Sequence, residues 1–379
     1  MKDILFNTDK VNLTRPIFGG LNSVAESVTP GHPDKTCDQI ANRYLDEALK
    51  ISPDSRVAIE MVACDGKIII GGEVSPWLKK EIKVEKIVKD VFKFLGYTED
   101  IIEVNDIINT QSVDIAEGVD REDKKLGAGD QGIMCGYAIY SPGSEHLPAA
   151  FFYSKSLSRK LFEVSMNKVI PSLRADGKTQ VIIIDGKIEQ VTIAIQHDNS
   201  WLNNKDLLNE KIIEHVIKPV AGKVPKIVIN GAGNFVKGSI WADAGEVGRK
   251  IVIDQMGPDI PVGGGSLCGK DPSKVDLTGA LMARYIAKNM VANKLANEAL
   301  VQIAFTIGQP EPDTINIFAP GWRLDIDPVD WVKKNFKLSV RDMINQLALT
   351  KPNGWSYEEA ARFGFYGNTK FPWEKILIY

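Results

Sequence analysis

The chain has 379 residues, more than one ordinary hydrophobic core accommodates, and this length predicts two or three domains. Hydrophobic residues make up 44% and charged residues 25%, and a formal net charge of −3 provides no positive excess for binding nucleic acid. The four cysteines lie far apart, and no apolar run resembles a signal peptide or a membrane span. We therefore expect a cytoplasmic protein that binds neither nucleic acid nor a membrane.

The first predicted elements form a pattern of helix, hairpin and helix. Apolar residues at helical spacing predict a helix over 36–50 and another over about 79–95. Between them, strand-like runs over 56–63 and 67–74 flank Asp65-Gly66, a dipeptide that favours a tight β-hairpin turn.

This pattern recurs further along the chain. The later elements are a helix near 155–168, strands 178–184 and 187–196, a helix 205–217, a helix 277–300, strands 301–308 and 313–318, and a helix 328–336. We predict an α+β fold of three structurally similar domains in a pseudo-threefold arrangement, each a mostly antiparallel sheet covered by helices. The predicted units are 22–114, 128–238 and 239–376, joined by a mobile loop or linker over 115–127, with segments exchanged between them in space.

The connection over 109–132 is polar, contains glycines and has no clear periodicity. Loops of this length in a compact protein are usually functional or disordered. A mobile lid over a site and a disordered linker both remain open at this stage.

The segment GGGSLCGKDPSKVD, residues 263–276, predicts a phosphate site. Its glycines allow backbone amides to approach an anion, Lys270 and Lys274 add positive charge, and Asp271 and Asp276 are possible oxygen ligands for a hard metal ion. Gly264 begins a G-x-x-x-x-G-K match, but Asp271 stands where a P-loop has Ser or Thr, so a P-loop NTPase is not favoured. A solvated turn remains the alternative.

Other candidate residues are charged side chains near the ends of predicted helices and strands. Pro33 favours the first turn of a helix, which leaves His32 and Asp34 at its positive end, although Asp34 alone can also be a simple capping residue. The remaining candidates are Asp130 between glycines, Asp176 and Lys178 at a strand, and Asp243, Arg249 and Lys250 after a glycine-bearing connection.

Together, GHPDKTCDQI, GAGDQG, GGGSLCGKDPSKVD and RYIAKN resemble the signature segments of the S-adenosylmethionine synthetase (methionine adenosyltransferase) family, in the family's order. The resemblance extends from about Ser23 to Lys375. It implies that methionine sulfur attacks C5′ of ATP and expels triphosphate, which is then hydrolysed to pyrophosphate and phosphate. It also implies a homodimer or a dimer of dimers whose subunits share each active site.

The resemblance also implies roles for individual residues. The catalytic residues it implies are His32, Lys178, Arg249, Lys250 and Lys270. Those implied for ATP are His32, Asp176, Lys178, Phe235, Asp243, Arg249, Lys250, Ser266 and Lys270, with Phe235 stacked on adenine. Those implied for methionine are Glu73, Gln111, Asp243 and Lys274. Asp34, Asp276 and Asp130 would bind two Mg²⁺ ions per site and Glu60 one K⁺, and the loop over 111–121 matches the family's gate.

The chain departs from the family pattern in its first twenty residues, which precede the first matching segment, and at several positions within the match. Asn234 stands where a basic residue is common, 238–242 replaces a glycine- and proline-rich stretch, and Cys268 replaces a small hydroxyl residue near the potassium site. Two other functions remain open: a non-catalytic regulatory subunit of the same fold, and a Mg²⁺-ATP phosphotransferase acting at the γ-phosphate.

Overall fold

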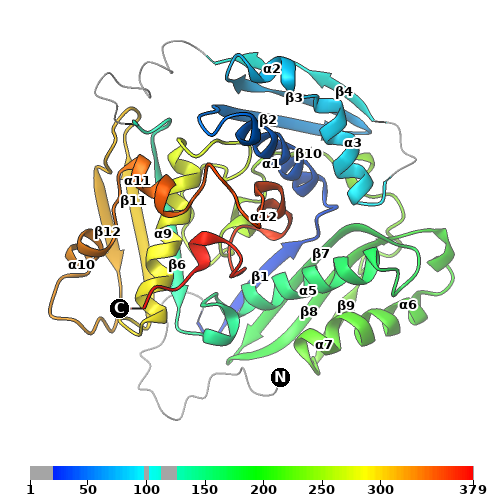
Figure 1. Cartoon of the computed structure of the whole chain (residues 1–379). Helices are drawn as coiled ribbons and strands as arrows, with labels where there is room; N and C mark the ends of the chain where they lie inside the picture. The colour runs from blue at the N-terminus through cyan, green and yellow to red at the C-terminus, as the bar shows by residue number, and fades with distance from the viewer. Residues whose placement is uncertain (1–19, 98–101, 112–125, 379) are drawn as a thin grey trace.

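The computed structural model describes residues 20–97, 102–111 and 126–378. The strands of this part form three sheets, and Figure 1 shows them placed around a central group of helices that includes α1, α9 and α12. The α+β prediction is confirmed. Among the described helices, none has both the length and the apolar character needed to cross a membrane.

The first sheet has the strand order β10-β2-β3-β4, with β5 paired to β3. Asp65 and Gly66 both adopt positive φ, 46° and 74°, which confirms the predicted hairpin turn. Alternate residues of β2 face the covering helices, while Val62 on the other face is 47% exposed. The elements are α1 Pro33–Ile51, β2 Val57–Cys64, β3 Lys67–Val74, α2 Leu78–Glu81, α3 Val84–Phe94, β4 Glu103–Asp106, β5 Asn109–Thr110 and β10 Gly245–Glu246.

The second sheet has the order β1-β7-β8-β9, and helix α5 packs on β1 and β7. Its β7–β8 turn again has positive φ at Asp185 and Gly186, as predicted. The elements are β1 Ser23–Val28, α5 Ala149–Met166, β7 Leu173–Ile184, β8 Lys187–His197, α6 Lys205–Ile212, a π-helical turn Ile213–Ile217, α7 Lys218–Ala221 and β9 Lys226–Ile229.

The third sheet has the order β12-β11-β6, with α9 against β6 and β11. Helix α12 lies near the centre of the molecule, in contact with α1, α5 and α8 (Figure 1). The elements are β6 Gly132–Ile139, α8 Ile251–Asp254, α9 Val275–Ala292, β11 Glu298–Phe305, β12 Thr314–Phe318, α10 Pro328–Asn335, α11 Val340–Gln346 and α12 Tyr357–Phe363.

Several predicted elements were wrong in extent. The helix over 277–300 ends at Ala292, because Lys294 adopts a positive φ and the chain then enters strand β11. The helix over 79–95 is interrupted at extended Ile82 and becomes α2 and α3. Strands β1, β6 and β9 and helices α11 and α12 were not predicted. Most of the predicted lid, residues 112–125, lies outside the described residues.

Candidate active site

The N-terminus of α1 forms the first part of the site. Pro33 begins the helix, and the His32 side chain caps it by accepting a hydrogen bond from the Asp34 amide at 3.2 Å. The preceding loop is fixed on β7 because the Thr29 hydroxyl donates to the Ala175 and Gly177 carbonyls at 2.5 and 3.1 Å. The predicted position of His32 and Asp34 at the helix end is confirmed, but the capping side chain is His32.

Asp34 is instead the partner of two cations. Its Oδ1 accepts from the Glu246 amide at 2.9 Å and lies 3.5 Å from Arg249 Nη1, and its Oδ2 accepts from Lys250 Nζ. The Asp34 carboxylate is almost completely buried, whereas the Arg249 side chain is 49% exposed. The helix N-terminus therefore carries a buried acid beside one exposed cation, Arg249, and one largely buried cation, Lys250.

The environment of His32 keeps its imidazole neutral. Burial, then the positive charge of Lys250, lower the pKa of His32 to about 3, and Lys178 acts in the same direction. Since Nδ1 accepts from the Asp34 amide, the proton of the neutral ring is on Nε2. Contact with Asp34 is consequently not an ion pair at physiological pH, and His32 presents a neutral N–H donor.

Acids surround the strand end that carries Lys178. Its ammonium lies 3.1 Å from the Glu26 carboxylate on β1. Asp176 accepts from the Ser239 amide at 2.7 Å. Burial raises the pKa of Asp176 to about 7; that hydrogen bond opposes the shift and the nearby Asp243 charge adds to it. Lys178 and Asp243 both act on the pKa of His32, and Asp243 also acts on that of Asp176, so these residues lie near one another.

A second charged group lies at the N-terminus of α9. Lys270 Nζ is 2.5 Å from Asp276 Oδ2, and both side chains are largely buried. The glycine loop presses against this pair, since a Cβ at Gly265 would lie 2.1 Å from Asp276 Cγ. Lys274 is the N-cap residue of α9 and is also buried. Asp130 lies in the neighbouring turn before β6, where it accepts from the Gln131 amide.

Asp271 has a structural role rather than the metal-ligating role that the sequence allowed. Its carboxylate is fully buried and accepts from the Val57 amide at 2.8 Å and from the Ser273 amide and hydroxyl at 2.9 and 2.6 Å. The loop is thereby attached to the start of β2.

The contacts divide the predicted cations into two groups within one chain. We define the α1 group as His32, Asp34, Lys178, Arg249 and Lys250, and the α9 group as Lys270, Lys274 and Asp276. They approach each other at the glycine loop, because a Cβ at Gly248 would lie 2.8 Å from Ser266 Cβ. Glu60 also lies between them: burial raises its pKa, Lys270 opposes this, and Glu246 adds to it.

The residues expected to bind methionine and adenine lie in two other parts of the structure. Glu73 on β3 pairs with Asn109 of β5, and the following Gln111 amide donates to the Val74 carbonyl, so Glu73 and Gln111 lie near the same end of β3. Phe235 follows β9 and is half-buried. Its amide donates to His197 Nε2 at 3.2 Å.

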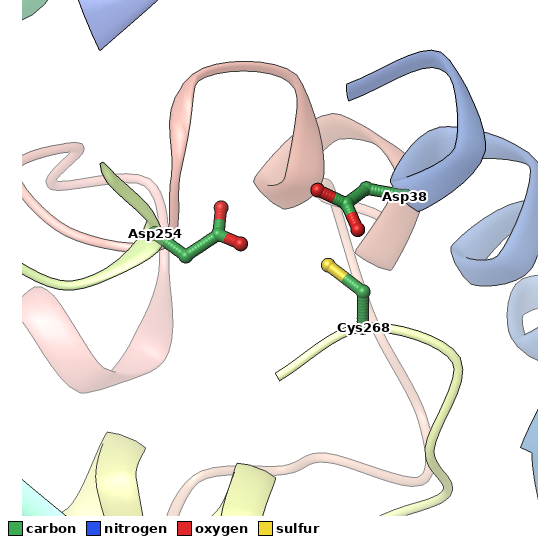
Figure 2. A group of neighbouring side chains, drawn as sticks. All are labelled: Asp38, Asp254 and Cys268. Atoms are coloured by element: carbon green, nitrogen blue, oxygen red, sulfur yellow. The ribbon is translucent and has the colours of Figure 1, made fainter. Parts of the chain in front are cut away.

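A buried ion cluster behind the α1 group was missed by sequence reasoning. Lys35 Nζ donates to Asp38 Oδ2 at 2.9 Å and to Asp254 Oδ1 at 2.5 Å, and all three side chains are buried. Figure 2 shows the Cys268 sulfur directed toward the same two carboxylates. The sulfur and one oxygen of each carboxylate lie within 4.8 Å of one another. Burial alone would lower the pKa of Lys35, but Asp254 and Asp38 outweigh it and raise that pKa. The Lys35 ammonium is therefore the cation of this cluster.

Asp38 connects that cluster to the α1 group. Its Oδ1 accepts from the Gly248 amide at 3.0 Å, which fixes the segment that continues into Arg249 and Lys250. The spacing of Lys35 and Asp38 on a helix was a visible signal for this pair. Asp254 had no such signal, because it lies 219 positions from Lys35 in the sequence.

Known proteins show the same organisation over nearly the whole chain. The N-terminal, central and C-terminal domain models of S-adenosylmethionine synthetase match residues 22–121, 125–235 and 237–375. S-adenosylmethionine synthases of Chlorobium phaeobacteroides and Wolinella succinogenes are each 37% identical over 93% of this chain and 94% of their own length. That of Sorangium cellulosum is 38% identical over 93% of this chain and 86% of its own. A solved structure of an unusual S-adenosylmethionine synthetase from Campylobacter jejuni superposes with a TM-score of 0.83 at 30% identity, covering 94% of this chain and 97% of that one. The chain belongs to the S-adenosylmethionine synthetase family.

Proposed function

We propose that this protein forms S-adenosylmethionine from ATP and L-methionine, by attack of the methionine sulfur on C5′ of ATP, and hydrolyses the released triphosphate to pyrophosphate and phosphate. The observation that carries the proposal is the α1 group, in which a neutral imidazole lies beside Lys250 and Lys178 at a helix N-terminus. This arrangement suits an oxygen leaving group on which negative charge grows.

The residues act on the leaving group in two ways. His32 donates its Nε2–H to the ribose O5′ or the adjacent phosphate, and it does so without needing protonation. Lys178, Arg249, Lys250 and Lys270 stabilise the triphosphate charge as the C–O bond breaks. The thioether needs no general base, because its sulfur carries no proton. Each well-placed donor contributes about 2.7–4 kcal/mol of transition-state stabilisation.

Metal ions fit the acids of both groups. Asp34 and Asp276 present carboxylate oxygens, which Mg²⁺ prefers, and each lies beside a lysine that can contact a phosphate oxygen of the same metal complex. We assign two Mg²⁺ ions to Asp34, Asp276 and Asp130. When bound, Mg²⁺ would neutralise polyphosphate charge. Glu60 is the candidate K⁺ ligand, while the Cys268 side chain belongs to the Lys35 cluster instead.

The remaining assignments concern the two substrates. We assign Phe235 to adenine, with Asp176, Asp243 and Ser266 as further ATP contacts. Glu73 and Gln111 are assigned to methionine, together with Asp243 and with Lys274 for its carboxylate. The proximity of Glu73 and Gln111 at one end of β3 supports a common ligand.

We also propose a cytoplasmic homodimer, or a dimer of dimers, in which two chains share each active site. One observation supports this: the outward sheet face beside Glu60 exposes Val62 and Ile69 at 47% and 50%. Pairing two chains across such faces would join the α1 group of one chain to the α9 group of its partner. We further propose domains near 22–114, 128–238 and 239–376, which the ranges of the three family models support.

Product analysis tests this function against its alternatives. Incubation with ATP, methionine, Mg²⁺ and K⁺ should yield S-adenosylmethionine, pyrophosphate and phosphate in equal amounts, without ADP. Formation of ADP would instead indicate transfer of the γ-phosphate. Absence of all products, from protein shown to be folded and dimeric, would indicate a non-catalytic subunit.

A further inference from the structure

The segment Phe235-Val236 is bound to the end of β8 by three hydrogen bonds. The Phe235 amide donates to His197 Nε2 at 3.2 Å, and the His197 amide donates to the Phe235 carbonyl at 2.9 Å. Gln196 Nε2 donates to the Val236 carbonyl at 2.9 Å. Gln196 and His197 are only 6% and 2% exposed. A two-residue segment is thereby fixed from both sides by two adjacent buried side chains.

Each of these side chains is itself oriented by a further partner. His197 Nδ1 lies 2.9 Å from the Asp198 carbonyl, so Nδ1 carries the proton and Nε2 is left as the acceptor for Phe235. Gln196 Oε1 accepts from the Tyr97 hydroxyl at 2.6 Å, which directs its amide group to Val236. The hydrogen-bonding roles are therefore determined at both positions.

Beside Val236, the segment is not closely packed on every side. A cavity of about 270 Å³ borders it, lined in part by Gln196, His197, Val236 and Trp241. Trp241 is anchored further along, with its ring centroid 5.3 Å from that of Tyr97. Val236 therefore faces open space, and the hydrogen bonds from His197 and Gln196 attach the segment to the end of β8.

We propose that His197 is a positioning residue for ATP, which acts by fixing the Phe235 backbone so that the ring meets adenine, with Gln196 supporting Val236. This inference rests on the proposed function, in which Phe235 stacks on adenine. Base–aromatic stacking contributes roughly 1–3 kcal/mol, equivalent to about 5- to 150-fold in affinity. Loss of His197 should therefore weaken the use of ATP within that range and leave steps that need no adenine unchanged.

The full-length enzyme provides two reactions that separate these effects: S-adenosylmethionine formation from ATP, and hydrolysis of added inorganic tripolyphosphate. His197→Leu should lower kcat/KM for ATP by about 5- to 150-fold, with KM for methionine and tripolyphosphate hydrolysis within about twofold of wild type. His197→Gln keeps an acceptor near the Nε2 position and should recover most of the loss. Because His197 acts through Phe235, His197→Leu should add less than about twofold in a Phe235→Ala background.

His146→Leu is the matched control, since His146 is likewise buried, 5% exposed, but lies after β6 in contact with the Ile139 carbonyl. It should reduce stability in urea without a selective effect on ATP. Equal loss of both reactions in His197→Leu, or additive losses in the double variant, would overturn the proposal. Failure of the proposed function is distinct, because wild-type protein would then form no S-adenosylmethionine.

Discussion

The α1 group and the α9 group both place lysine beside aspartate at a helix N-terminus, but the structure builds them differently. In the α1 group, a buried acid, Asp34, contacts cations of which Arg249 is 49% exposed, and the supporting ion cluster of Lys35 lies behind it. In the α9 group, Lys270 and Asp276 form one close pair against glycine backbone. Hydrogen bonds and ion pairs between side chains position the α1 group. Close approach of the glycine backbone, which has no Cβ, positions the α9 group.

This difference predicts different responses to substitution. The α1 group depends on buried charges whose loss costs folding free energy, because an unpaired buried charge is strongly destabilising. The α9 group depends on close approach, so a single added methyl group should disturb it.

The largest expected effect is on stability, in Lys35→Met. Removing the ammonium leaves Asp38 and Asp254 buried without their cation, which should cost about 3–5 kcal/mol in urea unfolding. Lys155→Met is the matched control: Lys155 is also buried, burial lowers its pKa, and it donates to the Gly364 and Tyr366 carbonyls. The control should lose only about 1–3 kcal/mol. Equal losses would show that the ion cluster has no special role.

The next effect is on catalysis, in Lys270→Ala. Removing one preorganised donor to the triphosphate should lower kcat for S-adenosylmethionine formation by about 10²- to 10³-fold while the circular dichroism spectrum remains unchanged. Lys333→Ala, at an exposed position of α10, controls for loss of a surface charge. A kcat within tenfold of wild type would remove Lys270 from the proposed mechanism.

Sequence reasoning identified the regions of local order best. Asp-Gly dipeptides located both hairpin turns, and the apolar spacing over 36–50 located α1, because these signals lie within a few neighbouring residues. It missed β1, a short strand whose partner β7 lies about 150 positions away, with Val28 opposite Lys178. Sequence reasoning also continued helix α9 into strand β11. In a continuous apolar run, the spacing typical of a helix cannot be distinguished from the alternation typical of a strand.

The same limit applies to the site. The motifs identified His32, Asp34 and Lys270 as site residues. They did not show that the charges would form two groups, because that depends on contacts between distant parts of the chain. The pairing of Lys35 with Asp254 depends on tertiary contact, as does the attachment of Phe235 to His197. No local pattern reports such contacts.

A smaller effect should follow from adding one methyl group in the glycine loop. In Gly265→Ala the new Cβ would lie 2.1 Å from Asp276 Cγ, so the loop or the acid must shift, at about 1–3 kcal/mol of stability. Tripolyphosphate hydrolysis should fall as well. Gly231→Ala is the control, because its Cβ would meet only Val228 Cγ1 at 3.1 Å, and neither glycine has a left-handed φ. An unchanged Gly265→Ala enzyme would contradict the role of close approach.

The smallest effect is the pH dependence of stability that His32 contributes. Its pKa is lowered from 6.5 to about 3 in the fold, so only the unfolded chain gains a proton as the pH falls below 6.5. The free energy of unfolding should thus decrease, relative to pH 8, by about 0.8 kcal/mol at pH 6 and about 2 kcal/mol at pH 5. In His32→Asn, which keeps a capping side chain, urea unfolding should lack this loss.

Asp176 provides the comparison of opposite sign. Its pKa is raised to about 7 in the fold, so the folded chain takes up a proton first and gains stability as the pH falls from about 7 toward 4. Asp176→Asn should therefore become more acid-sensitive relative to wild type, while His32→Asn becomes less so. Greater acid sensitivity in His32→Asn would contradict the burial of a neutral His32 beside Lys250. Lower acid sensitivity in Asp176→Asn would contradict the raised pKa of Asp176.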